Sequence, residues 1–284
     1  MENPELVNEN ATPSSINEDR PRPTEPSPNN PPWGSGVAIG VWLFSVFLIL
    51  ILPSIFLVIY SVTLNPPIRE TAALIEFAKN DKTAILVQIL AVIPAHVLTL
   101  ALAWLVITQN RTYSFRQTLG WRSGGVRWWH HVFIIFGFFL IAAVVSLYFP
   151  EQDNDLLRII QSSRTVAVLV AILATFTAPI VEEVVYRGIL YSAFQRSLNV
   201  PAAFLLVTLL FAIVHVPQYY PSYSTIFLLA LLSVTLTALR VRSRNLLPCI
   251  ILHMLFNGLQ SLRIVFEQAP ENSDPTGLIT WLLK

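Results

Sequence analysis

Long runs of apolar residues, separated by short polar connections, dominate the pattern of this chain. Each run is close to the roughly 20 residues that cross a bilayer as a helix. The fold class indicated is all-α: a polytopic helical membrane bundle, in which each backbone polar group is satisfied within its own helix. The pattern predicts seven spans, over residues 37–62, 84–107, 131–149, 165–196, 200–216, 223–241 and 246–266.

Three segments outside these runs follow other patterns. Residues 1–35 are rich in Pro and polar residues, which predicts a disordered tail in front of a transmembrane helical domain at 36–284. Residues 67–82 combine helix-period apolar positions with charges of both signs, which predicts an amphipathic surface helix. The stretch GLITWLLK at 277–284 is too short to span, so an eighth helix there would only lie at the interface.

Composition and charge agree with a protein embedded in a lipid bilayer. Hydrophobic residues make up 54% of the chain and charged residues 12%, against about a quarter charged in soluble proteins. A net charge of +1 gives no reason to expect nucleic acid as a partner. Alternating spans put ten Lys and Arg residues in the connections or at the adjoining span ends on the N-terminal side and six on the other, which predicts a cytoplasmic N-terminus. Without an organelle-targeting pattern, the predicted location is a prokaryotic inner membrane.

The fourth apolar run contains charges, in the stretch APIVEEVVYRGILY at 178–191. Ionisable residues inside a span are rare and by default mark a functional site. Glu183 and Arg187 are four residues apart, so they can form an ion pair on one helical face. Glu182 lies roughly 100° around the helix from Glu183 and has no local partner. Pro179 is expected to kink the helix and open room for water near Glu182.

Two later spans also carry polar residues. The fifth has His215, one turn after Phe211, and the seventh has His253 and Asn257 four residues apart on one face, with Gln260 extending that stripe. One intramembrane histidine is weak evidence, because such a residue is as often an interhelical hydrogen-bonder as a catalytic group. Polar groups on three spans together are harder to explain by packing alone.

These side chains suit amide hydrolysis by an activated water. A carboxylate in an apolar cavity can take a proton from water, helped by a neighbouring histidine, and His and Asn can donate to the developing oxyanion. A second interpretation uses Glu182, His215 and His253 as a zinc site with an open water position. The sequence leaves both open. It lacks H-E-x-x-H and G-x-S-x-G, and the single cysteine, Cys249, has no obvious base beside it, which disfavours a covalent nucleophile.

The motifs, taken in order, resemble a known family. The chain has E-E-x-x-x-R at 182–187, F-x-x-x-H at 211–215 and H-x-x-x-N at 253–257 on successive apolar runs. This resembles the type II CAAX prenyl endopeptidase family, the CPBP intramembrane proteases related to bacteriocin-processing and immunity proteins. The resemblance extends over about 115–265, including the lead-in FRQTLGWR at 115–122, which would be the catalytic core.

The resemblance implies an intramembrane endopeptidase that cleaves a membrane-associated protein or peptide, of CAAX type or another. Glu182 would be the general base, His215 its partner in activating water, and His253 with Asn257 the oxyanion site. The supporting residues would be Glu183, Arg187 and Phe211. The glutamate mechanism requires no cofactor, whereas the metal-dependent alternative would use a divalent metal such as zinc.

Two other classes of protein carry similar residues. An ion- or proton-coupled transporter also has intramembrane Glu, His and Arg, although no inverted repeat or pair of Gly-broken helices is evident. A bacteriocin-immunity protein or membrane scaffold would keep the fold without activity. The intact motifs favour the enzyme.

Helix depth provides a check on these hypotheses. At 1.5 Å per residue from the N-terminal side, Glu182 and His215 lie about 20 Å deep, but His253 only about 10 Å. The site can form only if helix tilt, a kink at Pro179 or a deeper start of the seventh span removes this mismatch.

Overall fold

A computed structural model of the chain describes residues 25–267, and the structural statements that follow refer to these residues. Within them most of the chain is helical, and there are no strands. Seven helices are long and apolar enough to cross a membrane: Ser35–Thr63, Lys82–Thr108, Trp128–Tyr148, Arg164–Ser197, Val200–Tyr219, Tyr223–Ser243 and Leu247–Phe266. The predicted all-α membrane bundle and its seven spans are therefore confirmed, whereas the stretch at 277–284 lies outside the described residues.

The first part of the chain contains the first three spans and a short helix after each of them. The helices are α1 (Ser35–Thr63), α2 (Thr71–Asn80), α3 (Lys82–Leu90), α4 (Val92–Thr108), α5 (Phe115–Leu119), α6 (Trp128–Tyr148) and α7 (Asp155–Ser162). The surface helix expected at 67–82 is the shorter α2, because Asp81 caps the next helix through Thr83 N and Ala84 N and so separates the two. Helices α3 and α4 together make the second span.

The second half contains the broken fourth span and three continuous ones. The fourth consists of α8 (Arg164–Ile172), the π-helical segment η1 (Leu173–Thr177), α9 (Ala178–Glu183), the π-helical segment η2 (Val184–Leu190) and α10 (Tyr191–Ser197). After it come α11 (Val200–Tyr219), α12 (Tyr223–Ser243) and α13 (Leu247–Glu267). Pro179 stands in the first turn of α9, directly after η1, so the irregularity lies where the sequence predicts one. Such π-helical turns are frequent at functional sites.

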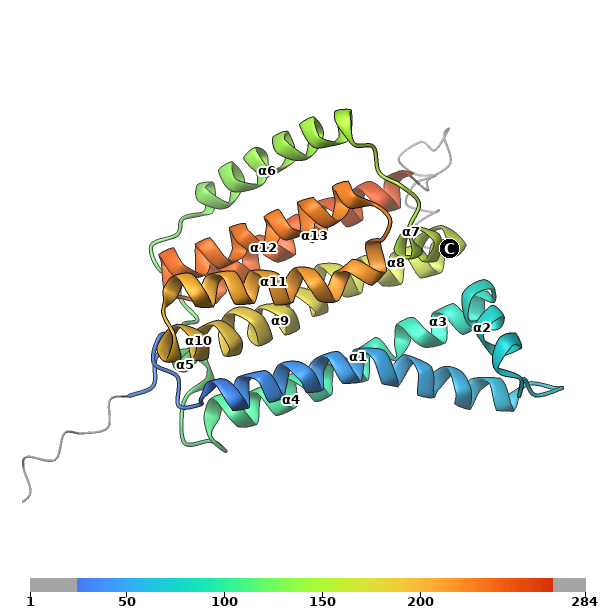
Figure 1. Cartoon of the computed structure of the whole chain (residues 1–284), viewed down its shortest axis with the longest axis horizontal. Helices are drawn as coiled ribbons and strands as arrows, with labels where there is room; N and C mark the ends of the chain where they lie inside the picture. Colours follow the sequence, from blue (N-terminus) through green and yellow to red (C-terminus); the bar gives the residue numbers. More distant parts are fainter. Residues whose placement is uncertain (1–24, 268–284) are drawn as a thin grey trace, which may run out of the picture.

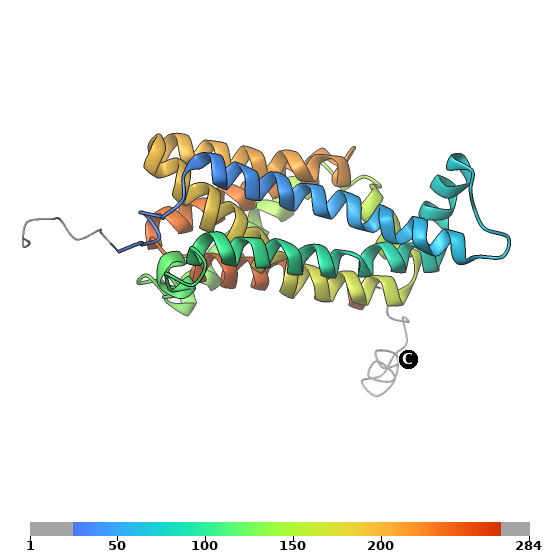
Figure 2. The same ribbon diagram turned by 90° about the horizontal axis from the view of Figure 1, so that it is seen from below.

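The broken helix lies in the middle of the bundle (Figure 1). It packs against α1 and α4 on one side and against α11 and α13 on the other, and α12 packs against both α11 and α13. Helix α6 forms the outer edge beyond α12 and α13. Helices α1 and α4 run side by side along the opposite edge (Figure 2). The charged stretch of the sequence therefore occupies the centre of the fold.

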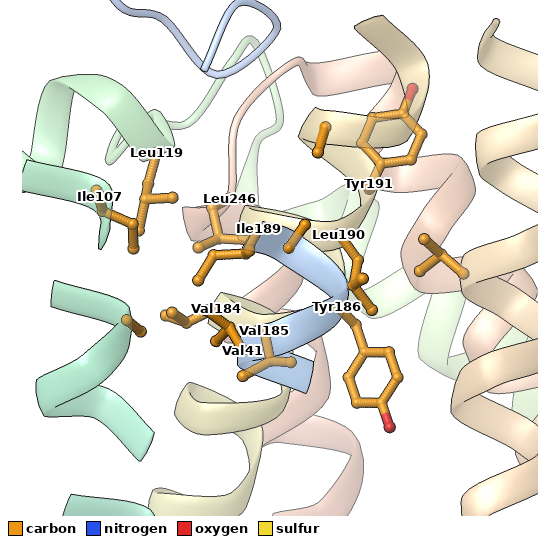
Figure 3. Packing of buried hydrophobic residues seen from close by; sticks show 14 of the residues in the cluster. Val41, Ile107, Leu119, Val184, Val185, Tyr186, Ile189, Leu190, Tyr191 and Leu246 are labelled. Carbon is orange, nitrogen blue, oxygen red and sulfur yellow. The ribbon is translucent and has the colours of Figure 1, made fainter. Parts of the chain in front are cut away.

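The main core surrounds η2. Every residue from Val184 to Leu190 is buried, as expected of a helix enclosed on all sides. Figure 3 shows the apolar side chains of this segment beside α1, with Ile107, Leu119 and Leu246 on the side of α4 and Tyr186 on the opposite side. A second, smaller core joins α6, α12 and α13 around Phe138, Leu236 and Phe256. The dense packing around η2 fixes the position of the residues that lead into it.

The prediction of disorder is wrong for residues 25–34, which we call the N-terminal segment. Trp33 is 3% exposed and donates its indole N–H to Ile189 O at 3.1 Å. Arg240 donates to Pro28 O at 2.5 Å and to Asn29 Oδ1 at 3.1 Å. Proline cannot donate a backbone hydrogen bond, but its carbonyl still accepts. A Pro-rich segment can thus be held by donors from elsewhere; the rest of the predicted tail, residues 1–24, lies outside the described residues.

The last span begins inside the fold. Leu246, directly before α13, is fully buried, and its N–H donates to Leu119 O at 3.2 Å and to Gly120 O at 3.0 Å. Gly120 has φ +73, and a Cβ there would meet Asn245 and Pro28 at 2.7 Å, so the close approach requires glycine. Because residues 115–120 cover its start, α13 places His253 deeper than a count from the bundle surface suggests.

Candidate active site

Glu182 lies between two histidines from two other helices. Its Oε1 is 3.9 Å from His215 Nε2 on α11, and its Oε2 is 3.7 Å from His253 Nε2 on α13. Both separations exceed a hydrogen bond. The Glu182 side chain is 24% exposed, that of His215 17% and that of His253 3%. The mismatch in depth is thus absent, and the three side chains meet around a partly accessible carboxylate.

Glu183 has the opposite environment. Its side chain is fully buried, and its Oε1 accepts from Arg187 Nη1 at 2.9 Å and from His253 Nδ1 at 2.9 Å. The ion pair expected from the spacing of Glu183 and Arg187 is present, and His253 joins it as a third member. The other oxygen, Oε2, is buried without a partner among the described residues. Glu183 therefore links the ion pair directly to one of the histidines beside Glu182.

Arg187 is held from α12 and α11. Its Nη2 donates to Ser233 O at 3.2 Å and Ser233 Oγ at 2.8 Å, and its Nε donates to Thr237 Oγ1 at 3.4 Å. Its guanidinium carbon lies 4.6 Å from the ring centroid of Phe211, a cation–π distance. The Phe211 ring also packs 4.7 Å from His215 and 6.1 Å from His253, measured between centroids. Glu183, Arg187 and Phe211, predicted as supporting residues, thus form one connected cluster next to Glu182 and its two histidines.

Hydrogen bonds fix the tautomer of each histidine. His215 Nδ1 lies 2.7 Å from Phe211 O, and a carbonyl only accepts, so Nδ1 carries the proton. His253 Nδ1 likewise donates to the Glu183 carboxylate. In the neutral rings each Nε2 then has a free lone pair, because one nitrogen donates and the other accepts. Both lone-pair nitrogens are the atoms closest to Glu182.

Asn257 is fixed by a carbonyl of η1. Its Nδ2 donates to Ala174 O at 2.8 Å. In the i→i+5 pattern of a π-helix, Ala174 O would accept from residue 179, which is Pro179 and has no N–H. The amide of Asn257 therefore replaces the missing donor, and one of its two N–H groups is used in this way. The polar stripe of α13 continues at Ser261, which bonds Thr175 Oγ1 at 3.1 Å, and not at Gln260, which is exposed.

The predicted zinc ligands do not form a metal site as they lie. No group of three or more His, Cys, Asp and Glu side chains in residues 25–267 is arranged to hold a metal ion. Carboxylate and imidazole Nε2 are suitable donors, but ligands of a tetrahedral zinc are about 3.4 Å apart at its usual bond lengths. The separations of 3.7 and 3.9 Å between Glu182 and the two histidines are wider. The mechanism proposed below uses only the side chains of the chain, and a metal held by Glu182, His215 and His253 remains the alternative to be tested.

Two further features of the site were not found from the sequence. His96 on α4 is 8% exposed, and its Nδ1 lies 3.0 Å from Thr177 Oγ1 at the end of η1. Arg240 on α12 is 1% exposed and donates from Nε to Arg187 O at 3.2 Å. Both are ionisable residues within predicted spans, so the rule that singled out Glu182 was a sufficient signal for them too.

Comparison with protein families agrees with the motif resemblance. Residues 164–259 match the family model described as Type II CAAX prenyl endopeptidase Rce1-like. The match extends from the first residue of α8 into α13, so it contains Glu182, His215, His253 and Asn257 but neither His96 nor the stretch at 115–122. Comparisons with curated proteins and with solved structures each gave no match. The family resemblance is confirmed over 164–259, and it supports a membrane-embedded hydrolase of the protease class.

Proposed function

We propose that this protein is an intramembrane endopeptidase that hydrolyses a peptide bond of a membrane-associated substrate. One observation carries the proposal: a carboxylate without a hydrogen bond in the described residues, Glu182, faces two imidazole lone pairs less than 4 Å away. A water molecule between these groups can donate its two protons to them. The matched family model is described as a prenyl endopeptidase, and the matched range 164–259 contains all three motifs, which supports the proposal.

In the proposed reaction Glu182 is the general base. It removes a proton from the water, whose second O–H donates to the Nε2 lone pair of His215 or His253. The water oxygen forms a bond to the carbonyl carbon, and the carbonyl oxygen becomes an oxyanion. Collapse of this intermediate breaks the C–N bond, and the departing amine takes the proton back from Glu182. A positioned general base of this kind contributes roughly 10²- to 10⁴-fold to the rate.

The oxyanion needs donors, and two are proposed. Asn257 has a second N–H beside the one bound to Ala174 O. When His215 accepts from the water, His253 is free to take a proton from solvent on Nε2 and so become a donor to the oxyanion, and Glu183 then stabilises the charged ring, as the carboxylate does in a Ser-His-Asp triad. Removal of a single oxyanion donor typically costs about 10²- to 10³-fold in rate. His253 is thus the proposed link between the buried ion pair and the reacting atoms.

The substrate class follows from the family description. A peptide ending in a prenylated cysteine and three further residues, the CAAX form, is the proposed substrate, because the matched family is described by it. The proposed setting is a prokaryotic inner membrane with a cytoplasmic N-terminus, based on the bias of basic residues between the two sides. Labelling of a cysteine introduced at Ser123 in intact cells tests this topology; labelling by an impermeant reagent from outside contradicts it.

The test is cleavage by purified protein in lipid vesicles. The probe is a fluorescence-quenched peptide with a farnesylated CAAX end, given to wild type, to Glu182→Gln and to the control Glu76→Gln. Glu76 is an exposed carboxylate on α2, away from the site. We expect cleavage by wild type and the control, and at least a hundredfold lower rate for Glu182→Gln. Equal rates for wild type and Glu182→Gln would refute the role of this carboxylate.

Two additions to the assay address the alternatives. Thorough chelation is expected to leave cleavage unchanged; a loss restored by zinc would instead assign Glu182, His215 and His253 to a metal. Ion flux across the vesicle membrane that depends on Glu182, without cleavage of any tethered peptide, would indicate a transporter. Neither cleavage nor flux would favour the scaffold or immunity protein.

A further inference from the structure

A cavity lies between α1, α2, α3 and α7, and none of the residues around Glu182 lines it. Its volume is about 690 Å³, within the range of roughly 300–1,000 Å³ that ligand pockets have. Helices α2, α3 and α7 lie at the end of the bundle opposite the N-terminal segment (Figure 1). This space, which we call the α2–α7 cavity, is therefore a second candidate binding site, separate from the proposed active site.

Much of the lining of the α2–α7 cavity is apolar. It includes aliphatic side chains from all four helices: Leu57 and Val58 of α1, Ile75 of α2, Ile85 and Ile89 of α3, and Ile159 of α7. Helices α1 and α3 belong to the first and second spans, so this lining continues into the hydrocarbon region of a bilayer. Val58 is 47% and Ile75 53% exposed. The lining is thus open to an apolar occupant, and each methylene group buried there adds to affinity.

Unbalanced positive charge lies at the same cavity. Lys79, in the last turn of α2, and Lys82, the first residue of α3, both line it, and neither forms an ion pair in the described part of the chain. Asp81, between them, is not a lining residue, and its Oδ1 accepts two backbone N–H groups of α3. A third cation of the lining, Arg158, pairs with Asp155, which also lines the cavity. The two lysines are therefore the charges that an anion would balance.

The type of basic residue also indicates the ligand. Lys79 and Lys82 are the only lysines in residues 25–267, where all other permanent cations are arginines. An ammonium group is a compact charge on a flexible stem, which suits contact with a phosphate. Lys82 is also the first residue of the second span, where the headgroup region of a bilayer meets the hydrocarbon. Two lysines at this level suit the phosphate group of a lipid.

We propose that the α2–α7 cavity binds one anionic phospholipid, with an acyl chain along the apolar lining and the phosphate beside Lys79 and Lys82. Basic pockets between membrane helices are suited to such headgroups. A soluble phosphate would leave the apolar lining without a partner, and an uncharged lipid would leave the two ammonium groups without an anion. The inference goes beyond the proposed endopeptidase and does not depend on it.

Native mass spectrometry of the purified full-length protein measures the binding. The probes are phosphatidylglycerol, which is anionic, and phosphatidylcholine, which is zwitterionic. Lys79→Gln combined with Lys82→Gln removes both charges, and the control is Arg69→Gln, because Arg69 is exposed in the same connection but does not line the cavity. We expect about 30-fold weaker binding of phosphatidylglycerol to the double variant, since each lysine contributes about 1 kcal/mol, or roughly fivefold. Binding to Arg69→Gln should be unchanged, and equal affinity of wild type and the double variant overturns the inference.

A second pair of variants tests whether an acyl chain occupies the cavity. Ala78→Phe fills space in the lining, and Ala73→Phe places the same ring at an exposed position of α2 outside the lining. Both variants keep the two lysines. With Ala78→Phe we expect phosphatidylglycerol to bind roughly fivefold more weakly or worse, because overpacking costs at least about 1 kcal/mol. Ala73→Phe should have no effect. Glycerol phosphate has the anion without the chains, and binding as tight as that of the lipid would indicate a phosphate site and refute the phospholipid.

Lysine chemistry provides an independent readout in a bilayer. Reductive methylation of amines, followed by peptide mapping, reports how accessible Lys79 and Lys82 are. In vesicles of phosphatidylglycerol both should react more slowly than in vesicles of phosphatidylcholine, and Ala78→Phe, but not Ala73→Phe, should remove this protection. Protection that persists in Ala78→Phe would mean general attraction to an anionic surface and would overturn the inference. Displacement of the lipid by a farnesylated peptide, or by formation of a dimer, would assign the cavity to another occupant and would overturn it too.

Discussion

Two neighbouring carboxylates in one helical turn have opposite environments. Glu183 is fully buried and accepts from both Arg187 and His253, whereas Glu182 is 24% exposed and has no hydrogen bond in the described part of the chain. A buried charge must be paired, because an unpaired one costs several kcal/mol. A carboxylate left open can instead bind water and take its proton. The same residue type therefore supports the fold at one position and is available for chemistry at the next.

The largest expected effect comes from breaking the buried pair. Arg187→Met leaves Glu183 uncompensated and removes the donors to Ser233, so we expect a loss of about 3–5 kcal/mol in unfolding free energy. SDS titration of the purified protein, followed by circular dichroism, measures it. The contrasting variant is Glu182→Gln, which should change stability by less than about 0.5 kcal/mol. Equal losses for both variants would contradict the comparison.

A smaller loss of unfolding free energy is expected when Asn257, whose amide replaces the N–H that Pro179 lacks, is substituted. Asn257→Leu leaves Ala174 O without its partner, and a buried unsatisfied group costs about 1–3 kcal/mol. The control on the same helix is Gln260→Leu, an exposed position where we expect a change near zero. The same titration compares them. A loss no greater for Asn257 than for Gln260 would show that the carbonyl of η1 is satisfied in another way.

The N-terminal segment provides the next test. Trp33→Phe keeps a large ring but loses the N–H bound to Ile189 O, with an expected cost of about 1 kcal/mol. Trp128→Phe is the matched control, since Trp128 is 74% exposed. Hydrogen exchange of η2 amides should increase with the first substitution and not with the second. Unchanged exchange in both would mean that Trp33 does not stabilise η2.

The smallest effect is expected for an exposed ion pair. Arg158 pairs with Asp155 on α7, and both side chains are more than 60% exposed. Arg158→Ala should cost about 0–1 kcal/mol, and the difference should vanish at high salt, because surface pairs are weak and screened. Unfolding at two salt concentrations is the measurement. A cost comparable to that of Arg187→Met would mean that burial does not decide the strength of these pairs.

Apolar runs were sufficient to predict the seven spans, because a bilayer requires long apolar helices. The meeting of Glu182 with His215 and His253 was inferred from polar residues on three spans, and the structure brings these side chains together. The segments η1 and η2 could not be predicted, because the choice between i→i+4 and i→i+5 bonds depends on tertiary packing. The hydrogen bond between Glu183 and His253 could not be predicted either. Local spacing identifies Arg187 as a partner of Glu183, but not a histidine 70 residues away.

For residues 25–34 the amino-acid composition led to a wrong prediction of disorder. A Pro-rich, polar stretch has little apolar area to bury, and this is why disorder was predicted. The stretch is held by Trp33 and by donors that reach its carbonyls from α10 and α12, such as Ser192 and Arg240. Those donors are more than 160 residues later in the chain, so no window of sequence around the segment contains the signal. His96 differs, because an ionisable residue inside an apolar run is visible in the sequence of its own span.

The contact between Arg240 and Pro28 has a consequence for how the protein is made. The two residues are 212 positions apart. At about 5–20 residues per second, a ribosome adds that length in roughly 10–40 s. Throughout this interval the carbonyl of Pro28 lacks its Arg240 donor, and the first span enters the membrane before this contact can form. The sixth span must therefore be synthesised before the start of the polypeptide can reach its final position.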